Sequence, residues 1–407
     1  MHAKYLTHLQ QIEELSEQER RTLSPIAETF VFRLNEYYKG LIQWDDPADP
    51  IRKLTIPSAT ELDEYGRLDP SDERLNYVAP GCQHKYTTTA LLLVSEVCGS
   101  YCRFCFRKRL FRNDVHETSL DVGEGIRYIA AHPEISNVLL TGGDSLILAT
   151  DRIEHILHEL RAIPHVKIIR FGSKLTAFNP MRIYEDERLL EVLERYSRPD
   201  ARIYQMAHFN HPRELTAQAL RAIAALQKAG VVTVNQTPLL GGVNDDVDVL
   251  RELLDRLSWA GVTPYYVFQN RPVAGNADFV VPLERAYDIV EGAKARTSGL
   301  GKRIKFVMSH SSGKIEILAV DKGKIFMKYH QARDPSDYGR FLVCDLPPQA
   351  AWFDDLHLPQ GPGECREEFI EAQEWRLQAI HEGIQAADRG GFADEEMVKT
   401  TFRQSEH

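Results

Sequence analysis

The chain has 407 residues, of which 43% are hydrophobic and 27% are charged, and its net charge at pH 7 is −10. This composition is typical of a globular protein and excludes a disordered chain. The acidic balance argues against a nucleic-acid-binding surface, because binding phosphates requires clustered Lys and Arg. We therefore expect a protein that acts on a small molecule and has no nucleic-acid partner.

The N-terminal segment, residues 1–85, lacks the apolar core of a signal peptide, and no run of about 20 apolar residues occurs in the chain. We expect a cytoplasmic protein without a membrane segment. Apolar spacing in residues 1–40 predicts helices, whereas residues 45–80 are rich in Pro, Asp, Glu and Gly. We interpret this second stretch as an irregular surface connector without a catalytic role.

Residues 86–320 alternate short apolar or β-branched runs with stretches of helical apolar spacing, which predicts an α/β fold with a parallel sheet. Six or seven such units suggest a whole or partial barrel, in which functional residues lie just after the strands. The predicted strands are 87–94, 137–140, 167–171, 202–207, 231–236, 264–268 and 304–309.

Residues 321–407 are expected to form a C-terminal extension that is helical at its end. The helical spacing resumes after a stretch rich in Pro and Gly, residues 346–364. We interpret the final helices as a packing or dimerisation element, which makes the protein a candidate homo-oligomer.

Cys98, Cys102 and Cys105 form a CxxxCxxC motif directly after the first predicted strand. Three thiolates in one loop bind three irons of a [4Fe-4S] cluster, and the fourth iron then stays open for another ligand. A ferredoxin would supply a fourth Cys, and a structural zinc site would add a second pair of ligands at finger or ribbon spacing. Three buried structural cysteines are a weaker alternative, because such residues need not cluster in a loop rich in Arg and Lys.

This motif, with Phe104 before the third cysteine and βα units after it, resembles the radical S-adenosylmethionine superfamily. Further along the chain, a series of segments is similar, in the same order, to landmarks of the lysine 2,3-aminomutase family. These segments are CRFCFRKRLF, LLTGGDSLIL, HFNHPRELT, NQTPLLGGVND, PYYVF and GKIEI.

The resemblance implies a partial (β/α)6-type TIM barrel, preceded by the N-terminal helices and followed by the C-terminal extension. It also implies three cofactors: a [4Fe-4S] cluster, S-adenosylmethionine and pyridoxal 5′-phosphate. In that family a 5′-deoxyadenosyl radical removes hydrogen from a small amino acid, whose amino group moves from C2 to C3. A one-electron donor such as flavodoxin or ferredoxin is the expected partner.

At the cluster side, the resemblance assigns Thr141, Gly142, Gly143 and Asp144 to the methionyl part of S-adenosylmethionine. Two glycines let a ligand approach the backbone, and a carboxylate can receive an ammonium group. The alternative is a plain turn from strand to helix with Asp144 as a helix cap. We further expect His208 and Gln236 to line the cofactor site, although His208 would serve equally well as a hydrogen-bonded supporting residue.

At the pyridoxal side, Lys314 takes the place of the lysine that binds pyridoxal phosphate covalently. A desolvated lysine has a lowered pKa and acts as an amine nucleophile. Here only SerSerGly precedes Lys314, so the family's glycine-rich stretch is shortened. Lys85 and Tyr86 match positions near the phosphate, and Phe268 matches an aromatic residue near the pyridine ring, where core packing is the alternative role.

Three residues are predicted to bind the substrate. Arg107 matches the arginine that holds the substrate carboxylate, which suits a bidentate guanidinium. Arg271, and either Ser309 or His310, stand where lysine-specific members carry two aspartates for the ε-ammonium group. We therefore expect a substrate other than lysine, with glutamate and aspartate as candidates, because a cationic side chain is repelled by Arg271.

Two other functions stay open at this point. The first is a radical S-adenosylmethionine enzyme of another reaction type, such as oxidation, epimerisation or protein modification, on the same scaffold. The second is a regulatory or electron-carrier protein whose cluster only senses or passes electrons. The open iron implied by three cysteines and the GGD segment argue against the second alternative.

Overall fold

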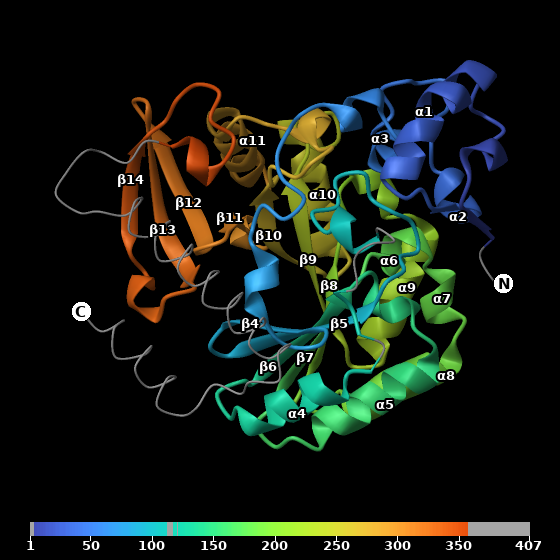
Figure 1. Ribbon diagram of the computed structural model, residues 1–407, viewed down its shortest axis with the longest axis vertical. Coiled ribbons are helices and arrows are strands. Elements are labelled where there is room, and N and C mark those ends of the chain that lie inside the picture. Colours follow the sequence, from blue (N-terminus) through green and yellow to red (C-terminus); the bar gives the residue numbers. More distant parts are fainter. Residues whose placement is uncertain (1–3, 112–116, 120, 357–407) are drawn as a thin grey trace, which may run out of the picture. The chain divides into compact units, whose positions relative to one another are not determined.

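The computed structural model describes residues 4–111, 117–119 and 121–356. A 12-stranded sheet runs through this part of the chain in the order β14-β13-β12-β11-β10-β9-β8-β7-β6-β5-β4-β3 (Figure 1). Its central strands pair in parallel from β5 to β11. They are β5 Thr89–Ser95, β6 Asn137–Gly142, β7 Ile168–Gly172, β8 Ile203–Ala207, β9 Val232–Leu239, β10 Thr263–Gln269 and β11 Lys305–His310. Each coincides with one of the predicted strands.

A helix connects each parallel strand to the next, which gives six βα units and a seventh parallel strand, in agreement with the predicted partial barrel. The apolar residues of these helices recur on one face; in α5 they are Ile153, Ile156, Leu157 and Leu160. Gly230 and Gly261 follow two of the helices with φ angles of 73° and 72°, the left-handed conformation that favours glycine. The helices are α4 Gly123–Ala131, α5 Thr150–Arg161, α6 Leu175–Phe178, α7 Met181–Tyr184, α8 Glu187–Tyr196, α9 Ala217–Lys228, α10 Val247–Trp259 and α11 Leu283–Arg296.

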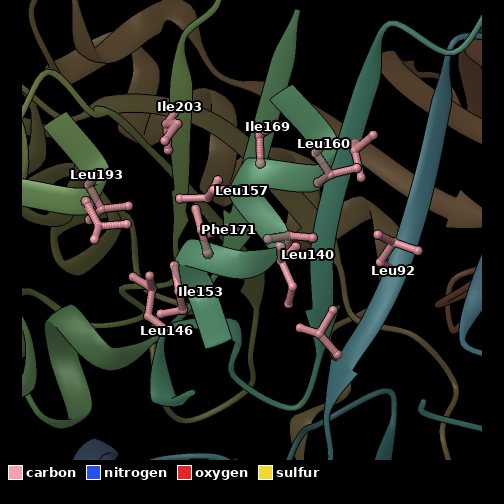
Figure 2. Close-up of a cluster of buried hydrophobic side chains, with 14 of the residues drawn as sticks. Leu92, Leu140, Leu146, Ile153, Leu157, Leu160, Ile169, Phe171, Leu193 and Ile203 are labelled. Carbon is pink, nitrogen blue, oxygen red and sulfur yellow. The ribbon is translucent and has the colours of Figure 1, made fainter. Parts of the chain in front are cut away.

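The core between the helices and the sheet is apolar throughout. Figure 2 shows side chains of α5, including Leu157, packed among those of the neighbouring strands, including Leu140, Ile169 and Phe171. All of these side chains are buried. The strands therefore have fixed positions, and the residues that follow them are held at one edge of the sheet.

Antiparallel strands extend both edges of the parallel sheet. At one edge β12 Gly313–Asp321, β13 Lys324–Ala332 and β14 Phe341–Asp345 follow β11, and they are orange in Figure 1. At the other edge β3 Tyr77–Ala79 and β4 Cys82–Tyr86 pair onto β5.

These strands change the expected domain boundaries. A division at residue 320 runs through the β12–β13 hairpin, and one at residue 85 runs through β4. The hairpin packs its apolar residues, such as Ile315 and Met327, into the same core as β11, so it is part of the sheet. The described residues accordingly belong to one compact unit, which includes the hairpin. The expected C-terminal helices lie outside the described residues.

The N-terminal elements pack over the loops that follow the parallel strands. Their apolar residues share a cluster with Phe104, Phe178, Leu240 and Phe279, which come after β5, β7, β9 and β10. The carboxyl ends of the strands are therefore covered by the N-terminal part of the chain. The elements are β1 Tyr5–Leu6, α1 Glu17–Thr29, β2 Leu34–Asn35, α2 Glu36–Lys39 and α3 Pro50–Thr55.

Candidate active site

A cavity of about 440 Å³ lies against the inner face of the parallel strands, within the range of ~300–1,000 Å³ that ligand sites usually have. All of the predicted site residues line it. They are Lys85, Tyr86, Cys98, Cys102, Cys105, Arg107, Thr141, Gly142, Gly143, Asp144, His208, Gln236, Phe268, Arg271, Ser309 and Lys314. We call the wall formed by the cysteine loop and the GGD turn the cluster region. The wall formed by Lys85, Arg107, Arg170, Arg271 and Lys314 is the cation region.

The three cysteines sit in a loop that both the N-terminal elements and the barrel hold in place. The backbone N–H of Tyr101 donates to Arg33, that of Arg103 donates to Leu54 at 2.9 Å, and that of Cys105 donates to Cys102. Burial raises the pKa of all three thiols, so they give up their protons only to a strong positive charge such as iron.

In the described residues, no three His, Cys, Asp or Glu side chains converge on a single metal ion. An iron-sulfur cluster does not require such convergence, because each thiolate binds a different iron. The three cysteines face one cavity, so their arrangement fits a cluster better than a mononuclear metal.

The GGD turn leads from β6 toward α5 and packs against the start of the cysteine loop. A Cβ on Gly143 would lie 2.4 Å from the carbonyl oxygen of Val97, and one on Gly142, whose φ is 107°, would lie 2.5 Å from that of Ser95. The N–H of Gly143 donates to the Ser95 carbonyl at 2.6 Å, and that of Asp144 donates to the Val97 carbonyl at 2.9 Å. Both glycines are therefore required for the close approach of the cysteine loop to β6.

Asp144 is engaged with the backbone. Its two carboxylate oxygens accept from the N–H of Leu146 at 3.0 Å and the N–H of Lys174 at 2.7 Å. This is the cap of the turn that follows, in agreement with the alternative role named above. Burial nevertheless raises the pKa of Asp144 to about 6, against these hydrogen bonds.

Two of the unsatisfied polar atoms on cavity-lining residues lie in or beside the cysteine loop. Within the described residues, Ser100 Oγ and His208 Nε2 are buried without a hydrogen-bond partner, and both residues line the cavity. Burial and the nearby charge of Lys174 lower the pKa of His208 to about 3, so its imidazole is neutral. Buried polar groups are normally paired, so these atoms fit a polar ligand such as S-adenosylmethionine.

Lys314 is an amine without a carboxylate partner in the described chain. It lies on β12, and its Nζ donates to Gln331 Oε1 on β13 at 2.6 Å. The rings of Tyr86 and Tyr266 lie 5.0 and 5.7 Å from Nζ. Burial, together with the charges of Arg170, Lys85 and Arg271, lowers the pKa of Lys314 to about 7. A neutral amine in this cavity fits the covalent attachment of an aldehyde cofactor.

Three hydrogen bonds to two residues hold the guanidinium of Arg107. Its Nε and Nη2 donate to the two carboxylate oxygens of Glu73 at 3.1 and 3.0 Å, and its Nη1 donates to Thr141 Oγ1 at 2.8 Å. Glu73 also accepts from Arg109 at 3.0 Å. Burial alone would raise the pKa of Glu73, but the surrounding guanidinium groups hold it far below its usual range.

Arg271 and Ser309 lie together on the cavity wall. Arg271 Nη2 donates to Ser309 Oγ at 2.9 Å, and its guanidinium lies 4.0 Å from the centre of the Phe106 ring. Lys85 is beside them and donates to the carbonyl oxygen of His310 at 2.8 Å. Burial and Arg271 lower the pKa of Lys85 to about 7. The residue predicted for the phosphate end thus lies next to the residues predicted for the substrate side chain.

Several residues that line the cavity were not predicted from the sequence. Glu73 belongs to the stretch that was interpreted as a surface connector, and Gln331 belongs to the expected extension. Arg170, whose Nε donates to Asn137 at 2.8 Å, lies in the middle of β7 rather than after it. An arginine inside a buried strand was a signal that the sequence contained, because such a charge needs a partner or a ligand.

Comparisons with known proteins show which family the chain is similar to. Residues 92–254 match the model of the Radical SAM superfamily. The chain is 53% identical over 353 residues to an Aquifex aeolicus protein provisionally named L-lysine 2,3-aminomutase, which covers 86% of this chain and 94% of that protein. The chain belongs to the lysine 2,3-aminomutase family of radical S-adenosylmethionine enzymes.

Other relatives in this aminomutase family carry two different substrate names. The chain is 36% identical to the L-lysine 2,3-aminomutase of Clostridium subterminale over 288 residues, which covers 70% of this chain and 68% of the relative. It is 35% identical to the glutamate 2,3-aminomutase of Clostridioides difficile over 294 residues, with 72% and 68% covered. The family consists of isomerases and implies a [4Fe-4S] cluster, S-adenosylmethionine and pyridoxal phosphate as cofactors.

Among residues 4–111, 117–119 and 121–356, every helix is too short or too polar to span a membrane.

Proposed function

We propose that this aminomutase moves the α-amino group of an acidic amino acid, glutamate or aspartate, from C2 to C3. Cys98, Cys102 and Cys105 would hold the cluster, and Lys314 would bind pyridoxal phosphate. When bound, the cluster and S-adenosylmethionine would supply the radical, and pyridoxal phosphate would stabilise it through its π system while the amino group migrates. The protein residues would orient the substrate and exclude water from it.

The charge of the cavity carries the substrate assignment. The cation region contains five Lys and Arg residues, while the carboxylates among the described cavity residues are Glu73 and Asp144. Glu73 is bound by two arginines, and Asp144 is bound by backbone N–H groups. No carboxylate among the described cavity residues is thus free for the ε-ammonium of lysine. Arg271, by contrast, has donors for a second substrate carboxylate.

The phosphate of pyridoxal phosphate would use part of the same positive charge. Arg170 has a neutral partner, Asn137, and lies close enough to Lys314 to depress its pKa. We place the phosphate near Arg170, and the two carboxylates of the substrate at Arg107 and Arg271. A one-electron donor such as flavodoxin or ferredoxin would reduce the cluster.

The test is a product screen with the anaerobically reconstituted full-length protein. The enzyme is given S-adenosylmethionine, pyridoxal phosphate, dithionite and each common amino acid, and the products are resolved by mass spectrometry. A β-amino acid from glutamate or aspartate supports the proposal. Formation of 5′-deoxyadenosine with no isomerised amino acid would replace it with another radical reaction on this scaffold.

A further inference from the structure

Glu73 occupies a place that the proposed roles of the arginines do not explain. It opens a short 3-10 helix, Glu73–Asn76, before β3, and its side chain is 11% exposed. The carboxylate accepts two bonds from Arg107 and one from Arg109. An anion at this point would compete with the substrate carboxylate if both needed the same donors of the guanidinium.

The geometry of Arg107 removes this conflict. Glu73 takes the edge formed by Nε and Nη2, and Thr141 takes one donor of Nη1. A guanidinium has more N–H donors than these three bonds use, and the remaining ones are on its two terminal nitrogens. Arg107 also lines the cavity, so it can still donate to a ligand carboxylate.

Arg109 anchors Glu73 on the far side from the cavity. Its side chain is 1% exposed, it does not line the cavity, and it also pairs with Glu117 at 3.0 Å and Asp69 at 3.6 Å. The charges thus alternate from the protein wall toward the cavity: Glu117, Arg109, Glu73 and Arg107. If the substrate displaced Glu73 from Arg107, the bond between Glu73 and Arg109 would have to break as well.

We infer that Glu73 is a positioning residue, which holds Arg107 by one edge and presents the other edge to the α-carboxylate of the substrate. Arg271 also lies within electrostatic reach of Glu73 and of Arg107, so the Glu73 carboxylate offsets part of the repulsion between the two guanidinium groups. The guanidinium groups of Arg107 and Arg271 can therefore face one cavity with reduced electrostatic repulsion. This inference rests on the proposed function, because it assumes that Arg107 binds a substrate carboxylate.

The experiment is calorimetric titration of the reconstituted holoenzyme with L-glutamate in the absence of reductant, so that binding is measured without turnover. Glu73→Gln keeps the shape of the side chain but loses the charge and one of the two acceptors. We expect its Kd to rise at least about tenfold, the loss expected when a charged hydrogen bond is broken. In turnover assays KM should rise similarly, while kcat changes less than about threefold.

Glu117→Gln is the matched control. It changes another carboxylate that, like Asp69, pairs with Arg109 but does not touch Arg107. We expect its Kd for L-glutamate to stay within about twofold of the wild type. If Glu73→Gln does not fold, Thr141→Val serves in its place: it removes the third bond to Arg107 and should raise Kd about threefold.

The outcomes separate the inference from the proposed function. A Glu73→Gln enzyme that binds L-glutamate as tightly as the wild type, or more tightly, overturns the positioning role and leaves the proposed substrate intact; an unchanged Kd in Thr141→Val does the same. An equal loss in Glu73→Gln and Glu117→Gln would assign both residues a merely structural role. A wild type that does not bind L-glutamate overturns the proposed substrate class, and the inference falls with it.

Discussion

Lys314 places a basic amine where a charge is unfavourable. Three cations surround it, and its one hydrogen-bond partner among the described residues is the amide oxygen of Gln331. A lysine is normally protonated up to about pH 10. The surroundings lower the pKa of Lys314 to about 7, so a large fraction of it is neutral at physiological pH. This shift gives the residue its expected reactivity toward an aldehyde.

We predict that Lys314→Met abolishes covalent binding of pyridoxal phosphate and spares the iron content. Absorbance of the cofactor and iron analysis measure the two effects. Lys305→Met is the control, because Lys305 pairs with Glu316 outside the cavity and its loss should leave the cofactor bound. Retention of covalent cofactor in Lys314→Met would show that another lysine binds it.

The pH dependence follows from the same lowered pKa. Folded Lys314 titrates near pH 7 and unfolded lysine near 10.5. Between these values the unfolded chain binds more protons, so the cofactor-free protein gains stability as pH rises from about 7 to about 10. Thermal unfolding of wild type and Lys314→Met across this range measures it. An identical pH dependence in the two proteins would contradict the shift.

Arg271→Asp tests the substrate assignment at one residue. The change replaces a guanidinium beside Ser309 by a carboxylate, so it should lower kcat/KM for glutamate at least about tenfold and increase turnover of lysine. Steady-state assays on both amino acids measure it. Undiminished activity on glutamate would mean that Arg271 does not contact the substrate.

At the scale of elements, the cysteine loop is positioned by close packing of backbone against β6. Gly143 is the tightest point, because a Cβ there meets the carbonyl group of Val97. From the sequence we expected that this glycine lets a ligand approach the backbone. The segment that packs against the turn cannot be identified before the loop is placed in space. Its position after a strand was predictable, but the neighbour that requires a glycine was not.

Gly143→Ala should therefore displace the loop and reduce the iron and sulfide bound after reconstitution to less than about half of wild type. The control is Gly299→Ala, where an added Cβ meets nothing within 4 Å. Iron and sulfide analysis, with circular dichroism to verify the fold, measures the effect. Full cluster loading in Gly143→Ala would show that the loop adapts to a side chain.

At the scale of the molecule, one sheet carries both regions of the cavity. The cysteines follow β5, while Lys314 and Gln331 lie on the antiparallel strands beyond β11. The parallel strands were predictable because each is a short apolar run between helices. The hairpin was not, because an antiparallel extension has no helix to mark it and its pairing partner is decided only in three dimensions.

Membership of the hairpin in the main fold has a measurable consequence. Met327→Ala on β13 leaves a gap in the core shared with β11, so it should cost about 2–5 kcal/mol and accelerate amide hydrogen exchange in β11 as well as β13. Phe341→Ala on β14 is the control, because Phe341 is 59% exposed. Acceleration confined to β13 and β14 would indicate a separate folding unit.

The role of Glu73, in the connector at residues 45–80, could not be predicted from the sequence either. Glu73 is one acidic residue among many there, and nothing in the local pattern distinguishes it. Its role depends on Arg107 and Arg109, which lie more than thirty residues away and reach it only in the folded chain. The cysteines, by contrast, are clustered within one loop, where spacing alone is informative.

The central claim is that the cavity selects an acidic substrate for amino-group migration. The most direct measurement is a competition in which the reconstituted enzyme receives equal concentrations of L-glutamate and L-lysine with its cofactors and dithionite, and both β-amino acids are quantified. The charge of the cavity predicts β-glutamate in at least about hundredfold excess over β-lysine. Predominant formation of β-lysine would contradict the account.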